Sequence, residues 1–135
     1  IMNINLIAST TDDPPPPNHE NIPISNIDQI PPRACTNLII DNVLNNLTQQ
    51  QLELLTSKMR HGGTITMHSP DAMEMAKALY WDKIKIDKFT SLTANTVAQH
   101  SMIEIKTFFE QRGYSIDIAN TDTNSLFFNI KAKRQ

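Results

Sequence analysis

TQQQLELLTSKMRHGG, residues 48–63, carries the signals that decide the fold. Thr48 and Gln51 have the spacing of a capping box, so the sequence predicts a helix over residues 48–60. One face of this helix carries apolar residues at helical spacing: Leu52, Leu55 and Met59. Gly62-Gly63 is predicted to end the helix, because glycine adopts the left-handed conformation of a helix C-terminus without steric cost.

Other segments extend the alternation of strands and helices. Short apolar or alternating runs predict strands over five segments: residues 4–8, 37–40, 64–68, 114–118 and 126–130. Ser69-Pro70-Asp71 predicts a helix start, with Ser69 as the N-cap and the proline at the first helical position. A second capping box, formed by Ser101 and Glu104, predicts a helix over residues 101–112. The order predicts an α/β fold with a mostly parallel sheet and a C-terminal antiparallel hairpin.

Composition limits the size and chemistry of the protein. The chain has 135 residues, of which 39% are hydrophobic and 19% charged, and this fits one domain over residues 1–135. A net charge of −2 gives no electrostatic sign of nucleic acid or of an anionic membrane as a partner. No apolar run approaches the roughly 20 residues that cross a bilayer, and the start lacks signal-peptide features, so we expect a cytoplasmic protein.

The positions of proline and cysteine further limit the secondary structure and the chemistry of the chain. The four consecutive residues Pro14 to Pro17 cannot enter a helix interior or a central strand, which predicts an exposed connection of polyproline II character at about residues 9–21. A docking site for an SH3- or WW-like partner is the alternative interpretation of this tract. Residues 22–30 are interpreted as a short strand and a turn, and residues 82–99 are ambiguous. Cys35 is the only cysteine, and we expect an inert thiol and no metal site.

Three segments, in order, resemble class I S-adenosylmethionine-dependent methyltransferases. NLIIDNVLNNL, residues 37–47, is similar to the family's "fDlv…vLeHl" segment, and KMRHGGTITM, residues 58–67, resembles its "lkpGGtlti" turn. Residues 102–118, which include FFEQRGYSIDI, resemble its "leeaGF.v" helix and strand. The resemblance covers about residues 22–131 and implies a reduced Rossmann-like sheet. The small size and the Asn-, Thr- and Ile-rich composition are reminiscent of phage-encoded proteins.

The sequence departs from the family pattern where the family holds its cofactor. The family's first strand ends in a glycine-rich loop, whereas the matching stretch NLIAST, residues 5–10, has no glycine. The next family unit is a helix, a strand and an acid that grips the ribose, and residues 11–21 are too few for it, so that unit is interpreted as deleted. The acid that contacts adenine aligns with Asn26, and Asp28 follows two residues later. The family's acid and histidine in "vLeHl" become Asn45 and Asn46.

The resemblance implies six vestigial cofactor-binding candidates: Ala8, Ser9, Asn26, Asp28, Asp41 and Asn42. We assign no catalytic residue and no metal ligand, and because of the departures we expect no cofactor. His68 ends a predicted parallel strand, where α/β proteins place ligands, but a structural role is favoured. His61 is interpreted as a cation at the end of the first predicted helix.

The leading functional prediction is a degenerate, non-catalytic methyltransferase-like domain that acts as a protein-binding or assembly module, with a virion component as one form of it. The partner is expected to be another protein chain or a second copy, in a host cytoplasm or a virion if the protein is phage-encoded. The surface left open by the deleted unit is expected near four apolar residues: Ile4, Leu6, Ile22 and Ile24. The alternative is an active S-adenosylmethionine-dependent methyltransferase with an unconventional cofactor loop.

Overall fold

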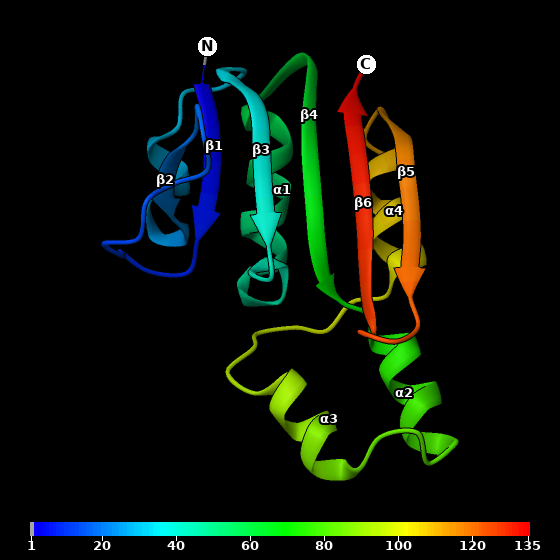
Figure 1. Ribbon diagram of the computed structural model, residues 1–135. Coiled ribbons are helices and arrows are strands. Elements are labelled where there is room, and N and C mark those ends of the chain that lie inside the picture. The colour runs from blue at the N-terminus through cyan, green and yellow to red at the C-terminus, as the bar shows by residue number, and fades with distance from the viewer. Residues whose placement is uncertain (1) are drawn as a thin grey trace.

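The computed structural model describes residues 2–135 and contains one six-stranded sheet, with strand order β2-β1-β3-β4-β6-β5 (Figure 1). The strands are β1 (Met2–Ile7), β2 (Glu20–Pro23), β3 (Cys35–Asp41), β4 (Met59–Pro70), β5 (Tyr114–Asp122) and β6 (Phe127–Arg134). The α-helices are α1 (Gln49–Lys58), α2 (Ala72–Tyr80), α3 (Ile86–Thr93) and α4 (Met102–Glu110). Two short 3-10 helices are η1 (Ile24–Gln29) and η2 (Leu44–Asn46).

Strands β1 to β4 pair in parallel, and β6 lies antiparallel between β4 and β5. The predicted mostly parallel sheet with a C-terminal antiparallel hairpin is therefore confirmed. The helices α1 and α4 also agree with their capping signals. The Thr48 hydroxyl accepts a hydrogen bond from the Gln51 backbone N–H, and the Gln51 side-chain oxygen accepts one from the Thr48 backbone N–H. The Ser101 hydroxyl accepts one from the Glu104 backbone N–H.

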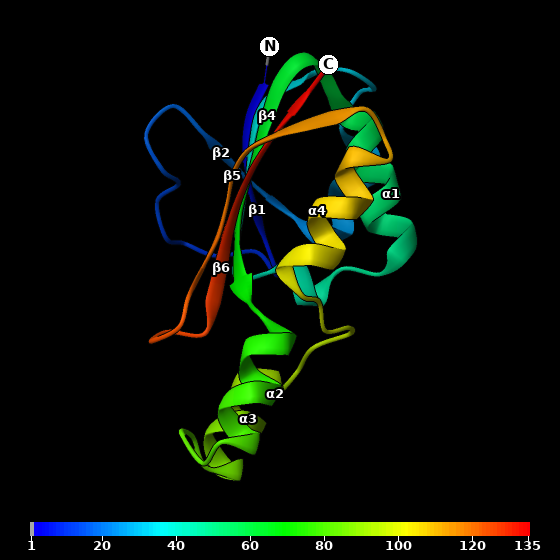
Figure 2. The ribbon, with the colours of Figure 1, turned by 90° about the vertical axis from the view of Figure 1, so that its right-hand side faces the viewer.

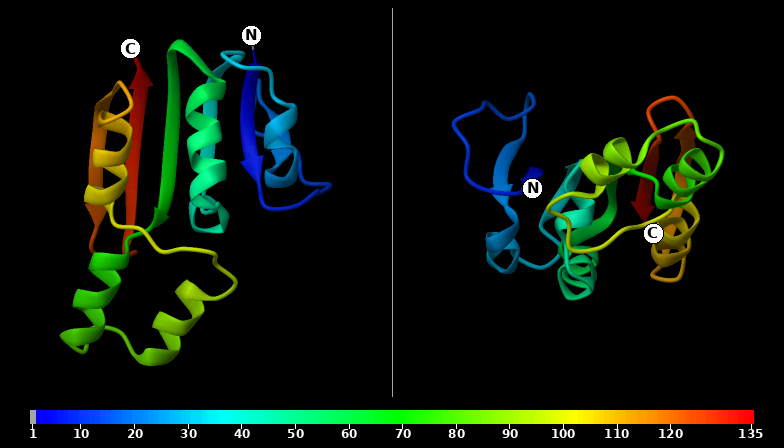
Figure 3. Two further views of the ribbon diagram at one scale, coloured as in Figure 1. Left: turned by 180° about the vertical axis from the view of Figure 1, so that it is seen from behind. Right: turned by 90° about the horizontal axis from the view of Figure 1, so that it is seen from below.

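In the part of the chain that the structure describes, helices cover only one face of the sheet, and η1, α1 and α4 make up that layer (Figures 2 and 3). The strand residues that face them are buried and apolar: Ile4, Leu6, Leu38, Ile40, Ile65, Met67, Phe128 and Ile130. Parallel sheets are usually covered on both faces, and their strands then read as continuous apolar runs. Here the strands alternate, so every second side chain points away from the helices.

Polar side chains bond to one another across the strands of the open face. Asn37 Nδ2 donates to Asn3 Oδ1 at 3.0 Å, and Thr64 Oγ1 donates to Asn37 Oδ1 at 2.7 Å. At the sheet edge Asn5 Nδ2 donates to Asn21 Oδ1 at 2.9 Å. These bonds stabilise a solvent-facing surface of the parallel sheet without a second helix layer.

The turn between α1 and β4 differs from its prediction. The helix ends at Lys58 rather than near residue 60, and His61 belongs to β4, so the interpretation of His61 as a helix-end cation is wrong. Asn37 pairs with Thr64 although Cys35 pairs with Met59, so extra residues of β4 loop out between these two pairs. Gly62 lies in this irregularity with a φ of +84°. Its left-handed backbone therefore allows β4 to bulge and does not end α1.

The first two strands bear on two further predictions. Residues 8–19 hold no helix or strand, in agreement with the prediction that residues 11–21 are too few for a helix–strand unit, and β2 pairs in parallel with β1 at the edge of the sheet. Residues 8–19 make the crossover as a mostly exposed loop on the open face of the sheet (Figure 2). After β2, η1 turns over the opposite face and packs against α1. The expectation that Ile4, Leu6 and Ile24 border an uncovered surface is therefore wrong, since all three are buried.

The helix pair α2–α3 extends beyond the carboxyl ends of the parallel strands (Figure 1). Pro70 is the last residue of β4, and Asp71 rather than Ser69 is the N-cap of α2. The inward face of α2 consists of Met75 and Ala78, which form a small second cluster with Leu126. The pair is also tied to the sheet by the backbone carbonyl of Asn45, which accepts hydrogen bonds from the segment after α3.

Asp71 joins four elements at the point where α2 leaves the sheet. Its side chain is buried, and Oδ1 accepts from the Met73 and Glu74 backbone at the start of α2. Oδ2 accepts from the Met102 backbone of α4 and from Thr121 Oγ1 of β5. The carboxylate thus fixes the positions of β4, α2, α4 and β5 relative to one another.

Asp71→Ala should lower the free energy of unfolding by roughly 2–4 kcal/mol, because it removes a helix N-cap and leaves buried donors unpartnered. Denaturant unfolding measures this loss. Asp117→Ala, at an exposed position of β5, is the matched control and should stay within about 0.5 kcal/mol of the parent chain. Equal effects of the two substitutions would contradict the role assigned to Asp71.

Candidate functional site

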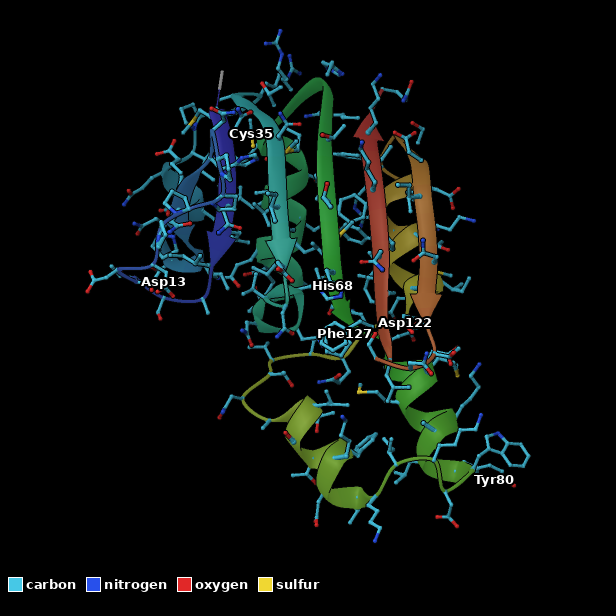
Figure 4. The ribbon with its side chains drawn as sticks, in the orientation of Figure 1. Asp13, Cys35, His68, Tyr80, Asp122 and Phe127 are labelled. Atoms are coloured by element: carbon cyan, nitrogen blue, oxygen red, sulfur yellow. The ribbon has the colours of Figure 1, made fainter. Side chains whose placement is uncertain are left out.

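A histidine and an aromatic ring lie together at the carboxyl end of β4, where Figure 4 shows His68 beside Phe127. Asp41 is the last residue of β3 and pairs in register with His68 of β4. His68 Nδ1 lies 3.0 Å from Asp41 Oδ1. The face of the His68 ring stacks on Phe127 of β6, with ring centroids 4.6 Å apart and an interplanar angle of 26°. The imidazole is therefore held by a carboxylate and an aromatic ring while much of it stays exposed.

The backbone after Asp41 turns sharply at this edge. Asn42 has a left-handed φ of +59°, a conformation that asparagine tolerates better than most residues. Its backbone N–H donates to the His68 carbonyl at 2.6 Å, which joins the two strand ends. The chain then enters η2, where Leu44 and Asn45 are buried.

Two pockets flank this turn. One of about 460 Å³ lies between the ends of β1 and β3 and the proline-rich loop, and Ala8, Asp41 and Val43 line it together with Pro14 to Pro16. The second, of about 260 Å³, lies toward α3 and is lined by Asn42, Asn45 and Phe127 among others. In parallel α/β sheets, ligands bind in crevices outside the carboxyl ends of the strands, so both pockets lie where a ligand is expected.

The structure brings together only part of the predicted cofactor set. Ala8 and Asp41 line the same pocket, and Ser9 and Asn42 follow them directly in the chain. Asn26 and Asp28 lie on η1, and Asn26 lines a separate depression of about 200 Å³ that also includes Met2. The two residues on η1 are thus not adjacent to the Asp41 pocket.

Sequence reasoning missed the pairing of Asp41 with His68 and the contribution of Phe127. It singled out Asp41 and His68 separately, each at a strand end. Asp41 and His68 lie equally far from the starts of the predicted strands, residues 37 and 64, and this was the signal that could have paired them. The stacking of Phe127 depends on the register of the antiparallel β6, which the sequence did not specify.

The other polar clusters are less suited to catalysis or ligand binding. A groove of about 570 Å³ between α1 and α4 contains Arg112, which forms an ion pair with Glu53 and lies 3.6 Å above the centre of the Phe108 ring. The Arg112 guanidinium holds the pKa of Glu53 below its usual value, but the pair lies at the surface, where ion pairs contribute little. Within residues 2–135 no cluster of His, Cys, Asp and Glu has the geometry of a metal site. None of the helices described there is long and apolar enough to span a membrane.

No family model matches the sequence, and no curated protein matches it. Solved structures do match. A chain from the complex between the Haloferax volcanii Trm112 methyltransferase activator and a protein assigned as a methyltransferase has a TM-score of 0.62 at 10% identity, over 98% of this chain and 71% of that one. Magnesium protoporphyrin IX methyltransferase from Synechocystis PCC 6803, solved with S-adenosylhomocysteine bound, has a TM-score of 0.55 at 14% identity, over 87% and 52%. Human N-acetylserotonin methyltransferase in complex with S-adenosylmethionine has a TM-score of 0.55 at 16% identity, over 87% and 34%.

The chain therefore has the Rossmann-like fold of class I S-adenosylmethionine-dependent methyltransferases, as the sequence resemblance predicted. It spans between 34% and 52% of the length of the two enzymes solved with ligand. The expectation of no cofactor is contradicted, because proteins of this fold are solved with S-adenosylhomocysteine and S-adenosylmethionine bound. That expectation relied on three departures from the family pattern together: the missing glycine loop, the missing ribose acid and the asparagine in place of the adenine acid.

Cys35 lies at the opposite end of β3 and is 1% exposed. Burial raises the pKa of its thiol to about 11, so at pH 8 about one molecule in a thousand carries the thiolate. We expect a chromogenic disulfide reagent at pH 8 to modify the folded protein at least 100-fold more slowly than the protein unfolded in guanidinium. Equal rates in the two states would show that the thiol is accessible and reactive.

Proposed function

We propose that this chain binds S-adenosylmethionine in the pocket beside Asp41 and acts as a methyltransferase with an unconventional cofactor loop. The observation that carries the proposal is the Asp41 carboxylate at the end of a parallel strand, in a pocket of about 460 Å³ that it shares with Ala8. That volume is within the range of small-molecule sites, and the position is the one where this class of sheet binds ligands.

The loop after β1 supports a cofactor site that lacks glycine. In the family, glycine relieves the tight turn from the first strand into a helix, but within residues 2–135 the element that directly follows β1 is the strand β2. Residues 8–19 leave the strand as an open loop instead, and Ser9, Thr10 and Thr11 are exposed. The Ser9 and Thr10 hydroxyl groups are available to a polar ligand, while Pro14 to Pro16 form an apolar wall of the pocket.

The residues present fit the polar half of such a cofactor. His68 engages Asp41 Oδ1, and within residues 2–135 no side chain is bonded to Oδ2, which remains to accept hydrogen bonds from ribose hydroxyls. Hydroxyl-to-carboxylate bonds are charge-assisted and are stronger than neutral ones. We propose Asp41 as the principal contact, with Ala8 and Ser9 on the loop side and Asn42 at the turn. Asn26 and Asp28 are not part of this site.

His68 is the candidate general base. S-adenosylmethionine, when bound, supplies an electrophilic methyl group on a positively charged sulfur. The contact of Nδ1 with Asp41 favours the tautomer in which Nε2 is free to accept a proton from a methyl acceptor. Stacking on Phe127 restricts rotation of the ring and so fixes the direction of Nε2.

A non-catalytic protein-binding or assembly module is the second candidate function. Several large apolar side chains of the α2–α3 pair are exposed: Met73, Tyr80, Trp81 and Ile86. Exposed apolar patches mark interaction surfaces, and one protein of the same fold is solved with an activator protein. The partner would be another protein chain or a second copy of this one.

The cofactor proposal predicts saturable binding of S-adenosylhomocysteine to the full chain by isothermal titration calorimetry. Asp41→Asn should weaken this binding about 10- to 100-fold, because it replaces a charge-assisted hydrogen bond worth about 1.5–3 kcal/mol. Asp117→Asn, on β5 and remote from the pocket, is the matched control and should bind like the parent chain. Absence of binding at millimolar ligand would refute the proposal.

The second candidate predicts self-association through the α2–α3 surface. In sedimentation velocity the parent chain should grow in mass with concentration, and Trp81→Lys should stay monomeric because a charge replaces a large exposed ring. Lys83→Ala, nearby on the same surface, controls for charge alone. A parent chain that stays monomeric at all concentrations would count against a second copy as the partner.

A further inference from the structure

The pocket beside Asp41 is lined by a single charged side chain. Besides Asp41, the neutral amide of Asn5 is the other polar side chain in its lining, and the remaining lining residues are apolar. Among the residues that line it there is no Lys, Arg or His. Apolar walls strengthen the field of a charge beside them, because they exclude water. Such a pocket favours a ligand that carries positive charge, since a cation finds a counter-charge there and an anion does not.

The segment that forms the outer wall of this pocket is acidic. Residues 1–32 contain no Lys or Arg and four acidic residues, so their formal charge is −4, against +2 for the rest of the chain. The four are Asp12, Asp13, Glu20 and Asp28. Asp12 and Asp13 are exposed and directly precede the prolines that line the pocket. Charges act over roughly 8–10 Å at physiological salt, so this pair adds to the negative potential that Asp41 creates in the pocket.

The cationic side chains of the open face lie farther away. Lys131 and Lys133 are on β6, which β4 separates from β3 and from Asp41. His68 contacts Asp41, but it is not among the residues that line the pocket, and histidine is largely uncharged at pH 8. The negative potential of the pocket is therefore not cancelled by a neighbouring cation at this pH.

We propose that the Asp41 pocket selects positively charged ligands and therefore binds S-adenosylmethionine more tightly than S-adenosylhomocysteine. This inference rests on the proposed function, because it assumes that these ligands enter this pocket. S-adenosylmethionine carries a positive sulfonium where S-adenosylhomocysteine has a neutral thioether, and their other ionisable groups are the same. In both, the sulfur is bonded to the 5′ carbon of the ribose. A ribose held by Asp41 therefore keeps the sulfur within the range of this carboxylate.

Exposure limits the size of this preference. The Asp41 side chain is 66% exposed, and charges at the surface attract each other weakly because water and salt screen them. We therefore expect a threefold to tenfold preference for S-adenosylmethionine. Loss of the sulfonium charge weakens binding by the same factor, which favours release of the neutral product.

The test is isothermal titration calorimetry of the full chain with each ligand at pH 8, in 20 mM and in 500 mM sodium chloride. At low salt S-adenosylmethionine should bind threefold to tenfold more tightly than S-adenosylhomocysteine. At high salt the ratio should fall below twofold, because the Debye length shortens from about 20 Å to about 4 Å. A preference that came from contacts of the extra methyl group would not change with salt.

Charge-removing variants locate the source of the preference. Asp41→Asn should bring the ratio at low salt below twofold, but it also weakens both ligands. Asp12→Asn combined with Asp13→Asn removes charge from exposed positions that are not assigned to the ligand. This double variant should lower the ratio about twofold and leave the affinity for S-adenosylhomocysteine within twofold of the parent chain. Asp28→Asn, on η1 and on the opposite face of the sheet, is the matched control and should leave the ratio unchanged.

Equal affinities at low salt, tighter binding of S-adenosylhomocysteine, or a preference that neither salt nor Asp41→Asn changes would overturn the inference. The proposed function would then still stand, because both ligands would bind. An equal effect of Asp28→Asn and of the loop variant would also overturn the inference, since the preference would follow the net charge of the chain rather than the pocket. Binding of neither ligand at millimolar concentration would refute the proposed function, and this inference with it.

Discussion

The absence of a second helix layer over the described sheet is the constraint on which the rest of this structure depends. A parallel sheet exposed on one face needs strands that alternate, and β1, β3 and β4 do so. The exposed positions then need partners of their own, which the Asn3–Asn37–Thr64 bonds supply. The same alternation places Asp41, His68 and Phe127 on the open face, where it meets the carboxyl edge. The grouping of Asp41, His68 and Phe127 thus follows from the single helix layer on the opposite face of the sheet.

The open face also changes what the chain needs after its first strand. A buried helix between β1 and β2 would require a tight turn, for which glycine is suited. An exposed proline-rich loop makes the same parallel crossover without it. Loss of the glycine loop therefore does not by itself imply loss of a ligand. Without a glycine-rich turn, the pocket is lined by the ends of β1 and β3 and by the stiff proline-rich loop, rather than by the backbone groups of the turn.

Local signals predicted the elements they specify. The Thr48–Gln51 box fixed the start of α1, and the three family-like segments predicted the sheet class. The sequence did not reveal the looped-out residues around Gly62, because a glycine after an apolar stripe is equally typical of a helix end. It also did not place Asn26 relative to Asp41, since the path of η1 depends on packing against α1. The Asp41–His68 contact needed the register of β3 and β4, which is a tertiary property.

The most direct measurement of the central claim is a map of amide chemical shifts in the full chain as S-adenosylhomocysteine is added. We expect the largest changes at residues 8–11 and 41–43, with smaller changes at His68. These segments converge only at the carboxyl ends of β1, β3 and β4. Changes confined to the groove between α1 and α4 or to η1, or no changes at saturating ligand, would contradict the central claim.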